Sequence, residues 1–309
     1  MALSKLSADE HGIILSQLCN ALEPRLTVYF SSASSGLRVL LTPALLQQLK
    51  ADHEVAAALC RKMGMSCKEL REAKKVSDKG LSVADLATLG SLGSVLPALE
   101  VLLLGEYDEG PYLQRLVEGL VAGALPAVTA LVGYHTEVCD AGASALATAL
   151  GRGALPRLRN LSLMGSALGN AGLVALAPAL RQLPGLEAID LGGNPVGDEG
   201  ISALLAPPLA ASAPPPPTVG LAKLKVLILE NIQITDAGCA ALASVIDNGA
   251  LPALEQLGLQ QEEPWTAASP AAVDAVLQVL VRACHRHHTK AHSECRMCWQ
   301  YGPTQVPHS

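Results

Sequence analysis

LPRLRNLSL, at residues 155–163, contains the spacing that decides the fold, with leucines at its first, fourth, seventh and ninth positions. Five further segments repeat this spacing, and they begin at Leu96, Leu125, Leu183, Leu221 and Leu251. The segment that begins at Leu125 has a glycine in the last place. Consecutive starts are 28 to 30 residues apart, except for one interval of 38. That interval contains the Ala/Pro-rich stretch 207–220, which is expected to loop out because polyproline cannot continue a helix. The period predicts a repeat architecture.

Each repeat combines a strand signal with a helix signal. The L-x-L triplet alternates inward and outward side chains, as a short strand does. An apolar helix is expected after each of four turns, at residues 143–150, 173–180, 201–205 and 239–246. The polar residues at these helix starts are predicted to accept backbone N–H groups of their own helices, namely Asp140, Asn170, Asp198 and Asp236. Stacked units of this kind predict an α/β solenoid, with parallel strands on the concave face and helices on the convex face.

The repeat resembles the ribonuclease-inhibitor type of leucine-rich repeat over residues 81–282. In that family an Asn stands three residues after the last strand leucine, and this chain has it at Asn194. Other residues occupy the equivalent places, namely Tyr107, Thr136, Ser166, Ile232 and Glu262. We therefore expect irregular turns within the same fold. The resemblance implies a protein that binds a partner.

Charge divides the chain into three parts. The net charge is +3 over residues 1–80, −11 over 81–282 and +2 over 283–309. An acidic centre disfavours nucleic acid and suits a basic protein partner. The sequence has no signal peptide and no apolar run long enough for a membrane span, so we expect eight reduced cysteines and no membrane contact. These features predict a cytoplasmic protein, with the nucleus as a second compartment.

Residues 1–80 lack the leucine spacing and are expected to form short helices. Capping boxes are predicted at Ser7–Glu10, Ser66–Glu69 and Ser82–Asp85. The stretch 9–41 has an apolar helix, a proline and a second apolar patch, and in this it resembles an F-box. Two interpretations stay open: a helical cap that shields the first repeat, or a module that binds the adaptor of a cullin-type ubiquitin ligase.

The tail, residues 283–309, is rich in Cys and His. Cys284, His288, Cys295 and Cys298 are of the types that hold tetrahedral zinc. Their spacing matches no standard zinc finger, so a metal-free polar tail is the alternative interpretation.

No phosphate loop, nucleophile elbow or zinc-protease motif is present, and the sequence predicts binding rather than catalysis. Outward strand positions should form the concave binding face. The candidate contact residues on it are Tyr134, Met164, Asp190, Ile228, Glu230 and Gln260. The leading hypothesis is an interaction scaffold for a protein partner. The alternatives are a substrate receptor of a cullin-type ligase and an activator of the small nuclear-transport GTPase, a fold-level analogy alone.

Overall fold

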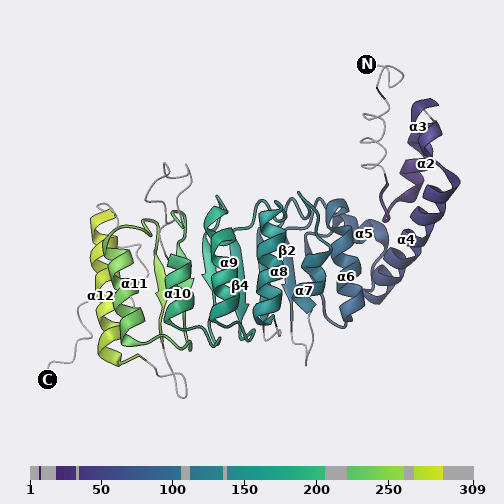
Figure 1. The fold of residues 1–309 in the computed structure, drawn as a ribbon. Coiled ribbons are helices and arrows are strands. Elements are labelled where there is room, and N and C mark those ends of the chain that lie inside the picture. The colour runs from purple at the N-terminus through teal and green to yellow at the C-terminus, as the bar shows by residue number, and fades with distance from the viewer. Residues whose placement is uncertain are drawn as a thin grey trace.

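The fold was obtained as a computed structural model, which describes residues 7, 19–32, 35–105, 112–134, 138–205, 221–260 and 268–287. Helices and strands alternate along an elongated body, with the N-terminal helices at one end and the last helix at the other (Figure 1). The predicted insert at 207–220 lies outside the described residues.

One parallel sheet runs through the body. Its strands follow sequence order, each paired with the next: β1 (Lys75–Ser77), β2 (Val101–Leu104), β3 (Ala130–Tyr134), β4 (Asn160–Met164), β5 (Ala188–Asp190), β6 (Val226–Ile228) and β7 (Gln256–Gly258). The register aligns equivalent leucines, so that Leu102, Leu131 and Leu161 are direct neighbours. Each strand therefore adds its inward leucines to one continuous row.

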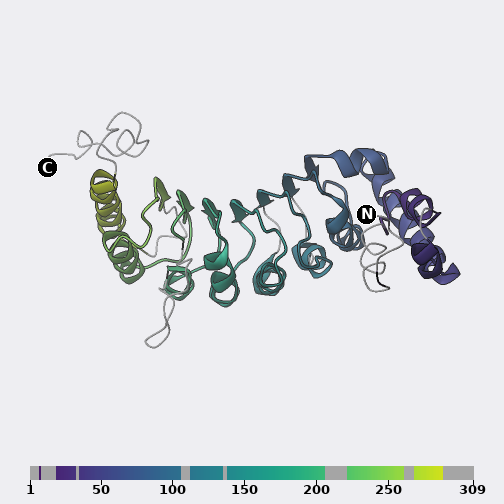
Figure 2. The same cartoon turned by 90° about the horizontal axis from the view of Figure 1, so that it is seen from above.

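The helices form a second layer outside the sheet. Viewed from above, the strands line the inner side of an arc and the helices line its outer side (Figure 2). This layer consists of α6 (Val83–Ser91), α7 (Tyr112–Glu118), α8 (Cys139–Gly151), α9 (Asn170–Gln182), α10 (Asp198–Leu205), α11 (Asp236–Asp247) and α12 (Pro270–His287). Between the layers, one core of buried Leu, Ala, Val and Ile extends from Leu22 to Ala283. This arrangement confirms the predicted α/β solenoid.

The sheet begins earlier than the sequence suggested. Strand β1 pairs with β2 through Val76 and Leu102, although it lies within the segment 1–80 that lacks the leucine spacing. Val76 is buried, and Asp78 takes the place of the second inward leucine. The backbone N–H of Gly105 donates to the Asp78 carboxylate at 3.0 Å. A strand whose pattern is V-x-D could not be recognised as a copy of L-x-L, which is why the boundary at residue 80 falls inside the first strand–helix unit.

Apart from β1, the N-terminal part that the structure describes is helical. It comprises α2 (Pro24–Ser32), α3 (Ser35–Leu40), α4 (Pro43–Lys62), the short helix α5 (Cys67–Glu72) and, after α6, the 3₁₀ turn η2 (Leu92–Val95). The predicted boxes at Ser66–Glu69 and Ser82–Asp85 are both formed. The box predicted at Ser7–Glu10 lies outside the described residues, apart from Ser7 itself.

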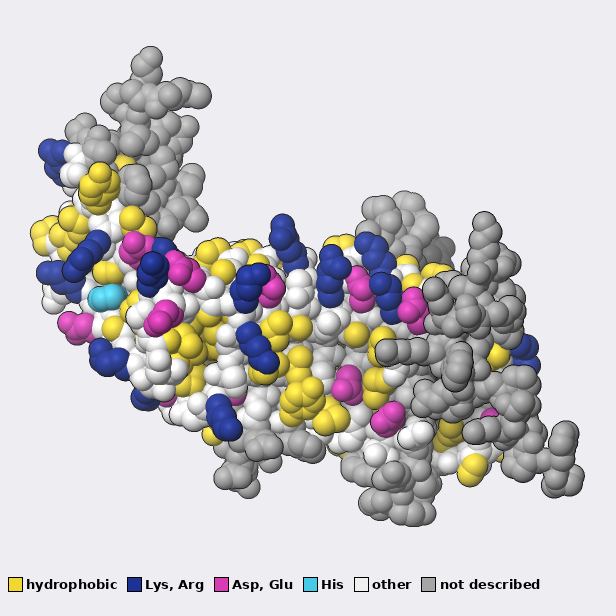
Figure 3. Space-filling model, turned by 180° about the vertical axis from the view of Figure 1, so that it is seen from behind, with side chains coloured by type: hydrophobic (Ala, Val, Ile, Leu, Met, Phe, Trp, Pro, Cys, Tyr) yellow, Lys and Arg dark blue, Asp and Glu magenta, His cyan; other side chains and the backbone are white. Residues whose placement is uncertain are grey.

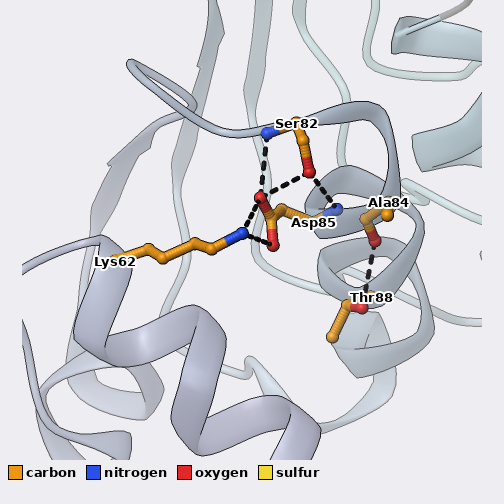
Figure 4. A network of polar contacts seen from close by, with 5 residues as sticks. All are labelled: Lys62, Ser82, Ala84, Asp85 and Thr88. Atoms are coloured by element: carbon orange, nitrogen blue, oxygen red, sulfur yellow. Dashed lines mark hydrogen bonds and ion pairs between the residues drawn. The ribbon is translucent and has the colours of Figure 1, made fainter.

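Asp85 also joins the N-terminal helices to the first repeat. Its carboxylate accepts bonds from the backbone N–H and hydroxyl of Ser82, at 2.9 and 2.6 Å, and from Lys62 Nζ at 2.7 and 2.8 Å (Figure 4). Partial burial by itself raises the pKa of Asp85, but the bonds from Lys62 and Ser82 outweigh it and hold the pKa below its ordinary value. Lys62 ends α4 and Asp85 lies in the first turn of α6, so this contact fixes one helix against the other.

The helix-start residues act differently from the prediction. The carboxylate of Asp140 accepts the N–H of Gly169 in the next repeat at 2.8 Å, and Asn170 accepts those of Gly197 and Gly200 at 2.8 and 3.1 Å. Asp198 accepts both the N–H and the hydroxyl of Thr235, and Asp236 makes the same pair of contacts with Ser269. The prediction that they cap their own helices is therefore wrong: they lie in the first turn of one helix and bind the start of the next.

Asn194 behaves as the resemblance implied. Its side chain is buried, and its carbonyl oxygen accepts the N–H groups of Ser166 and Leu168 at 2.9 and 3.0 Å. Its amide donates to the carbonyls of Leu163 and Leu191 at 2.7 and 2.9 Å. One side chain thus satisfies backbone groups of two successive turns.

The C-terminal end is covered on the helical side by α12, which packs against α11 and has Val276 and Leu280 buried. This helix continues to His287, five residues beyond the predicted end of the repeat domain at 282. Cys284 lies in its last turn, and its side chain is not described. His288, Cys295 and Cys298 lie outside the described residues, and among those described no group of three His, Cys, Asp or Glu side chains is placed to hold a metal.

Candidate functional site

The concave face is built from the outward side chains of the strands, which the parallel register arranges in rows. One row runs through successive neighbours, namely Ser77, Leu103, Val132, Ser162, Asp190, Ile228 and Gly258. The described strand positions Leu103, Val132 and Ile228 are only partly buried. Hydrophobic side chains accordingly gather over the middle of this face (Figure 3).

All six predicted contact residues lie at the strand-end side of this face. Tyr134 and Met164 are direct neighbours at the ends of β3 and β4, and Tyr134 is 43% exposed. Asp190 and Ile228 are neighbours on β5 and β6. Glu230 and Gln260 follow β6 and β7, and the backbone N–H of Asn231 donates to the carbonyl of Gln260. Tyr134 and Met164, at the ends of β3 and β4, form the apolar half of this set. Asp190 on β5 and Glu230 after β6, beside Ile228 and Gln260, form its acidic half.

The carboxylate of Asp190 is held in place. It accepts the hydroxyl of Ser162 from β4 at 3.0 Å and the N–H of Gly192 at 3.0 Å. A carboxylate fixed by two donors loses little side-chain freedom when a cation of a partner approaches. Ser162 was not among the predicted contact residues. The one feature that could have indicated a role for Ser162 was its position in the same row as Asp190.

Glycines leave room beside both acids. A Cβ atom at Gly258 would lie 2.7 Å from Oε1 of Glu230, so the glutamate side chain lies across the backbone of β7 at this point. A Cβ atom at Gly192 would lie 3.3 Å from Oδ1 of Asp190. The acidic half is therefore bordered by small residues, which leave space for the two carboxylates beside the backbone.

Buried thiols do not offer a nucleophile in the described core. Burial, hydrogen bonding to Cys67 and the charge of that neighbour raise the pKa of Cys60 to about 12. Burial, then the nearby carboxylates of Asp236 and Asp198, raise the pKa of Cys239 to about 11. A catalytic cysteine needs the opposite shift, because the thiolate is the reactive form.

Comparison with known proteins agrees with this architecture. Residues 184–205 match the family described as Leucine Rich repeat. A stretch of 128 residues is 34% identical to ribonuclease inhibitor from Sus scrofa, which corresponds to 41% of this chain and 26% of that protein. The chain thus has the architecture of a leucine-rich repeat protein, and the matched stretch is similar to the ribonuclease-inhibitor type. It spans about a quarter of the length of this curated relative.

Three solved structures are similar at lower levels. The actin-binding site 2 of leiomodin-1 is 15% identical, with a TM-score of 0.34 over 50% of this chain and 80% of the other. The tropomodulin C-terminal domain from Caenorhabditis elegans is 12% identical, with a TM-score of 0.38 over 67% and 96%. An internalin from Listeria monocytogenes is 15% identical, with a TM-score of 0.32 over 62% and 54%.

No helix within the described ranges is long and apolar enough to cross a bilayer.

Proposed function

We propose that this leucine-rich repeat protein is an interaction scaffold whose concave face binds a protein partner. The observation that carries the proposal is the continuity of one face, apolar at Tyr134 and Met164 and acidic at Asp190 and Glu230. Extended concave surfaces are what solenoids offer to partners. Partly exposed apolar side chains gathered on one face are typical of such contacts.

The chemistry of this face defines the partner we expect. Apolar side chains of the partner would cover Tyr134 and Met164, where removal of apolar area from water supplies most of the affinity. Lys or Arg side chains of the partner would face Asp190 and Glu230, which fixes orientation and speeds association. A basic protein segment with interspersed apolar residues meets both requirements. The name of the curated relative, an inhibitor of an enzyme, supports binding rather than catalysis.

Two finer hypotheses concern who the partner is. A cullin-ligase adaptor would bind the N-terminal segment, and a small nuclear-transport GTPase would bind the repeats. The predicted location, cytoplasm with the nucleus as a second compartment, is compatible with both and is part of the same proposal. Identification of the proteins that co-purify with the full chain distinguishes them, because each names a different class of partner.

The experiment compares full-length variants. Asp190→Asn combined with Glu230→Gln removes two charges from the concave face while it keeps side-chain size. The matched control, Glu54→Gln combined with Glu199→Gln, removes two exposed charges elsewhere. We expect the first variant to bind the co-purified partner about tenfold more weakly and the control to bind it normally. Equal affinity of both variants for that partner would remove the acidic half from the proposed site.

A further inference from the structure

A second surface lies at the edge of the sheet where the chain enters the strands, opposite to the edge where the strands end. A cavity of about 480 Å³ opens there, at the approaches to strands β2 to β6. Three cations line it, namely Arg157, Arg159 and Lys223, together with one carboxylate, Glu100. Figure 3 shows Lys and Arg side chains, interspersed with Asp and Glu, along the upper margin of the strand-lined face. We call this cavity the strand-start groove.

The repeat explains why the cations flank an open space. Arg157, Gly185 and Lys223 occupy the same position in three consecutive repeats, two residues after the first leucine of each. A Cβ atom at Gly185 would meet nothing closer than the Leu158 carbonyl oxygen at 3.8 Å. The space beside Gly185 is therefore open, and Arg157 and Lys223 lie in the repeats on either side of it.

Two cations of this region are already matched by one acid. Glu187 pairs with Arg159 at 3.1 Å and with Lys225 at 2.9 Å. The bond from Lys225 chiefly, and then the charges of Lys225, Arg159 and Lys223, lower the pKa of Glu187. In the part of the chain that the structure describes, no carboxylate forms an ion pair with Arg157 or Lys223. The groove thus keeps an excess of positive charge.

The neighbouring insert does not change this balance. Residues 206–220, which directly precede Leu221 and Lys223, contain no ionisable side chain. A charge from another molecule is therefore the natural complement of Arg157 and Lys223.

We propose that the strand-start groove binds an acidic segment of a protein, with carboxylates of the segment paired to Arg157 and Lys223. Arg side chains bind carboxylates through two parallel N–H donors, which gives this contact direction as well as strength. Discrete carboxylates fit a site whose cations alternate with Glu100 and Glu187. A phosphate backbone would instead meet those two acids along its length, in a chain of net charge −6.

Full-length protein and a labelled, end-capped peptide of alternating Glu and Ala test the proposal by fluorescence anisotropy. We expect saturable binding that weakens between low and physiological salt, and no binding of the Gln/Ala version of the peptide. Arg157→Gln combined with Lys223→Gln should raise the Kd about tenfold or more. The control, Lys50→Gln combined with Arg282→Gln, makes the same change in net charge at exposed sites far along the chain and should leave the Kd unchanged.

Three results would overturn the proposal. They are no binding of the Glu/Ala peptide, equal affinity of the groove variant and the control variant, and tighter binding of a single-stranded oligonucleotide of equal charge. The concave-face variant with Asp190→Asn and Glu230→Gln separates this site from the first one. It should bind the acidic peptide as the wild type does, so failure at either surface is seen independently of the other.

Discussion

Neighbouring repeats of this solenoid are linked both at the helix starts and at the strand-end turns. A polar side chain makes this link regularly only at the helix starts. At the helix starts, four successive junctions use a polar side chain that binds the next repeat, from Asp140 to Asp236. At the strand-end turns, Asn194 spans two turns with its side chain, while Ile232 occupies the equivalent place in the following repeat. There the backbone itself makes the link, since the N–H of Gln233 donates to the carbonyl of Val196 at 2.7 Å.

Burial accounts for this difference. The acceptors at the helix starts are half-buried or exposed, so water can replace part of a lost contact. Asn194 is wholly buried, and the groups it binds have no access to solvent. A recurring polar residue therefore indicates a repeated but individually modest contact, whereas a single buried one indicates a contact on which the local turn depends.

The largest effect is expected at Asn194. Asn194→Leu keeps the branched shape of the side chain and removes its bonds to the N–H groups of Ser166 and Leu168 and to the carbonyl of Leu163. We expect a loss of about 3 kcal/mol or more in the free energy of unfolding, measured by urea denaturation. Asn248→Leu, at an exposed helix end, is the control and should change stability by less than about 0.5 kcal/mol. Equal losses in both variants would contradict the role of burial.

A smaller effect is expected at the helix starts. Asn170→Ala removes the acceptor of the Gly197 and Gly200 N–H groups, and should cost about 1 to 2 kcal/mol by the same measurement. Asn170→Asp keeps the acceptor oxygen and adds negative charge at a helix N-terminus, so it should retain most of the stability. A loss in the Asp variant as large as in the Ala variant would show that the contact depends on the amide and not on its oxygen.

The smallest effect concerns Asp85, which caps its own helix. Because its folded-state pKa is lowered, its contribution is complete above the ordinary carboxyl pKa and is lost as the pH falls through the folded value. Asp85→Asn should therefore be slightly less stable near neutral pH, by less than about 1 kcal/mol because the contact with Lys62 is partly exposed. Its melting temperature should also fall less steeply than that of the wild type between roughly pH 5 and 2.

Asp52→Asn, an exposed change on α4, is the control for this series and should follow the wild-type pH profile. If Asp85→Asn followed it too, the network around Lys62 and Ser82 would contribute nothing to acid stability.

In the candidate site, as in the fold, some features follow from the sequence of one repeat and others depend on the register between repeats. The outward positions of Tyr134, Met164, Asp190 and Ile228 follow from the two-residue alternation of each strand, and the structure places them on one face. The hydroxyl of Ser162 on Asp190 depends on which residues the register sets side by side, and no spacing within one repeat contains that information. The strand-start groove also depends on register, because Arg157, Gly185 and Lys223 belong to three different repeats.

By itself, the sequence determined whatever depends on contacts within a few residues. The leucine spacing predicted strands and helices, and the boxes at Ser66 and Ser82 formed as expected, since their partners are three residues away. Only the tertiary structure decided that Asp140 binds the next helix start, and that a V-x-D segment begins the sheet. Those contacts join residues about one repeat apart, and their geometry exists only after the repeats have stacked.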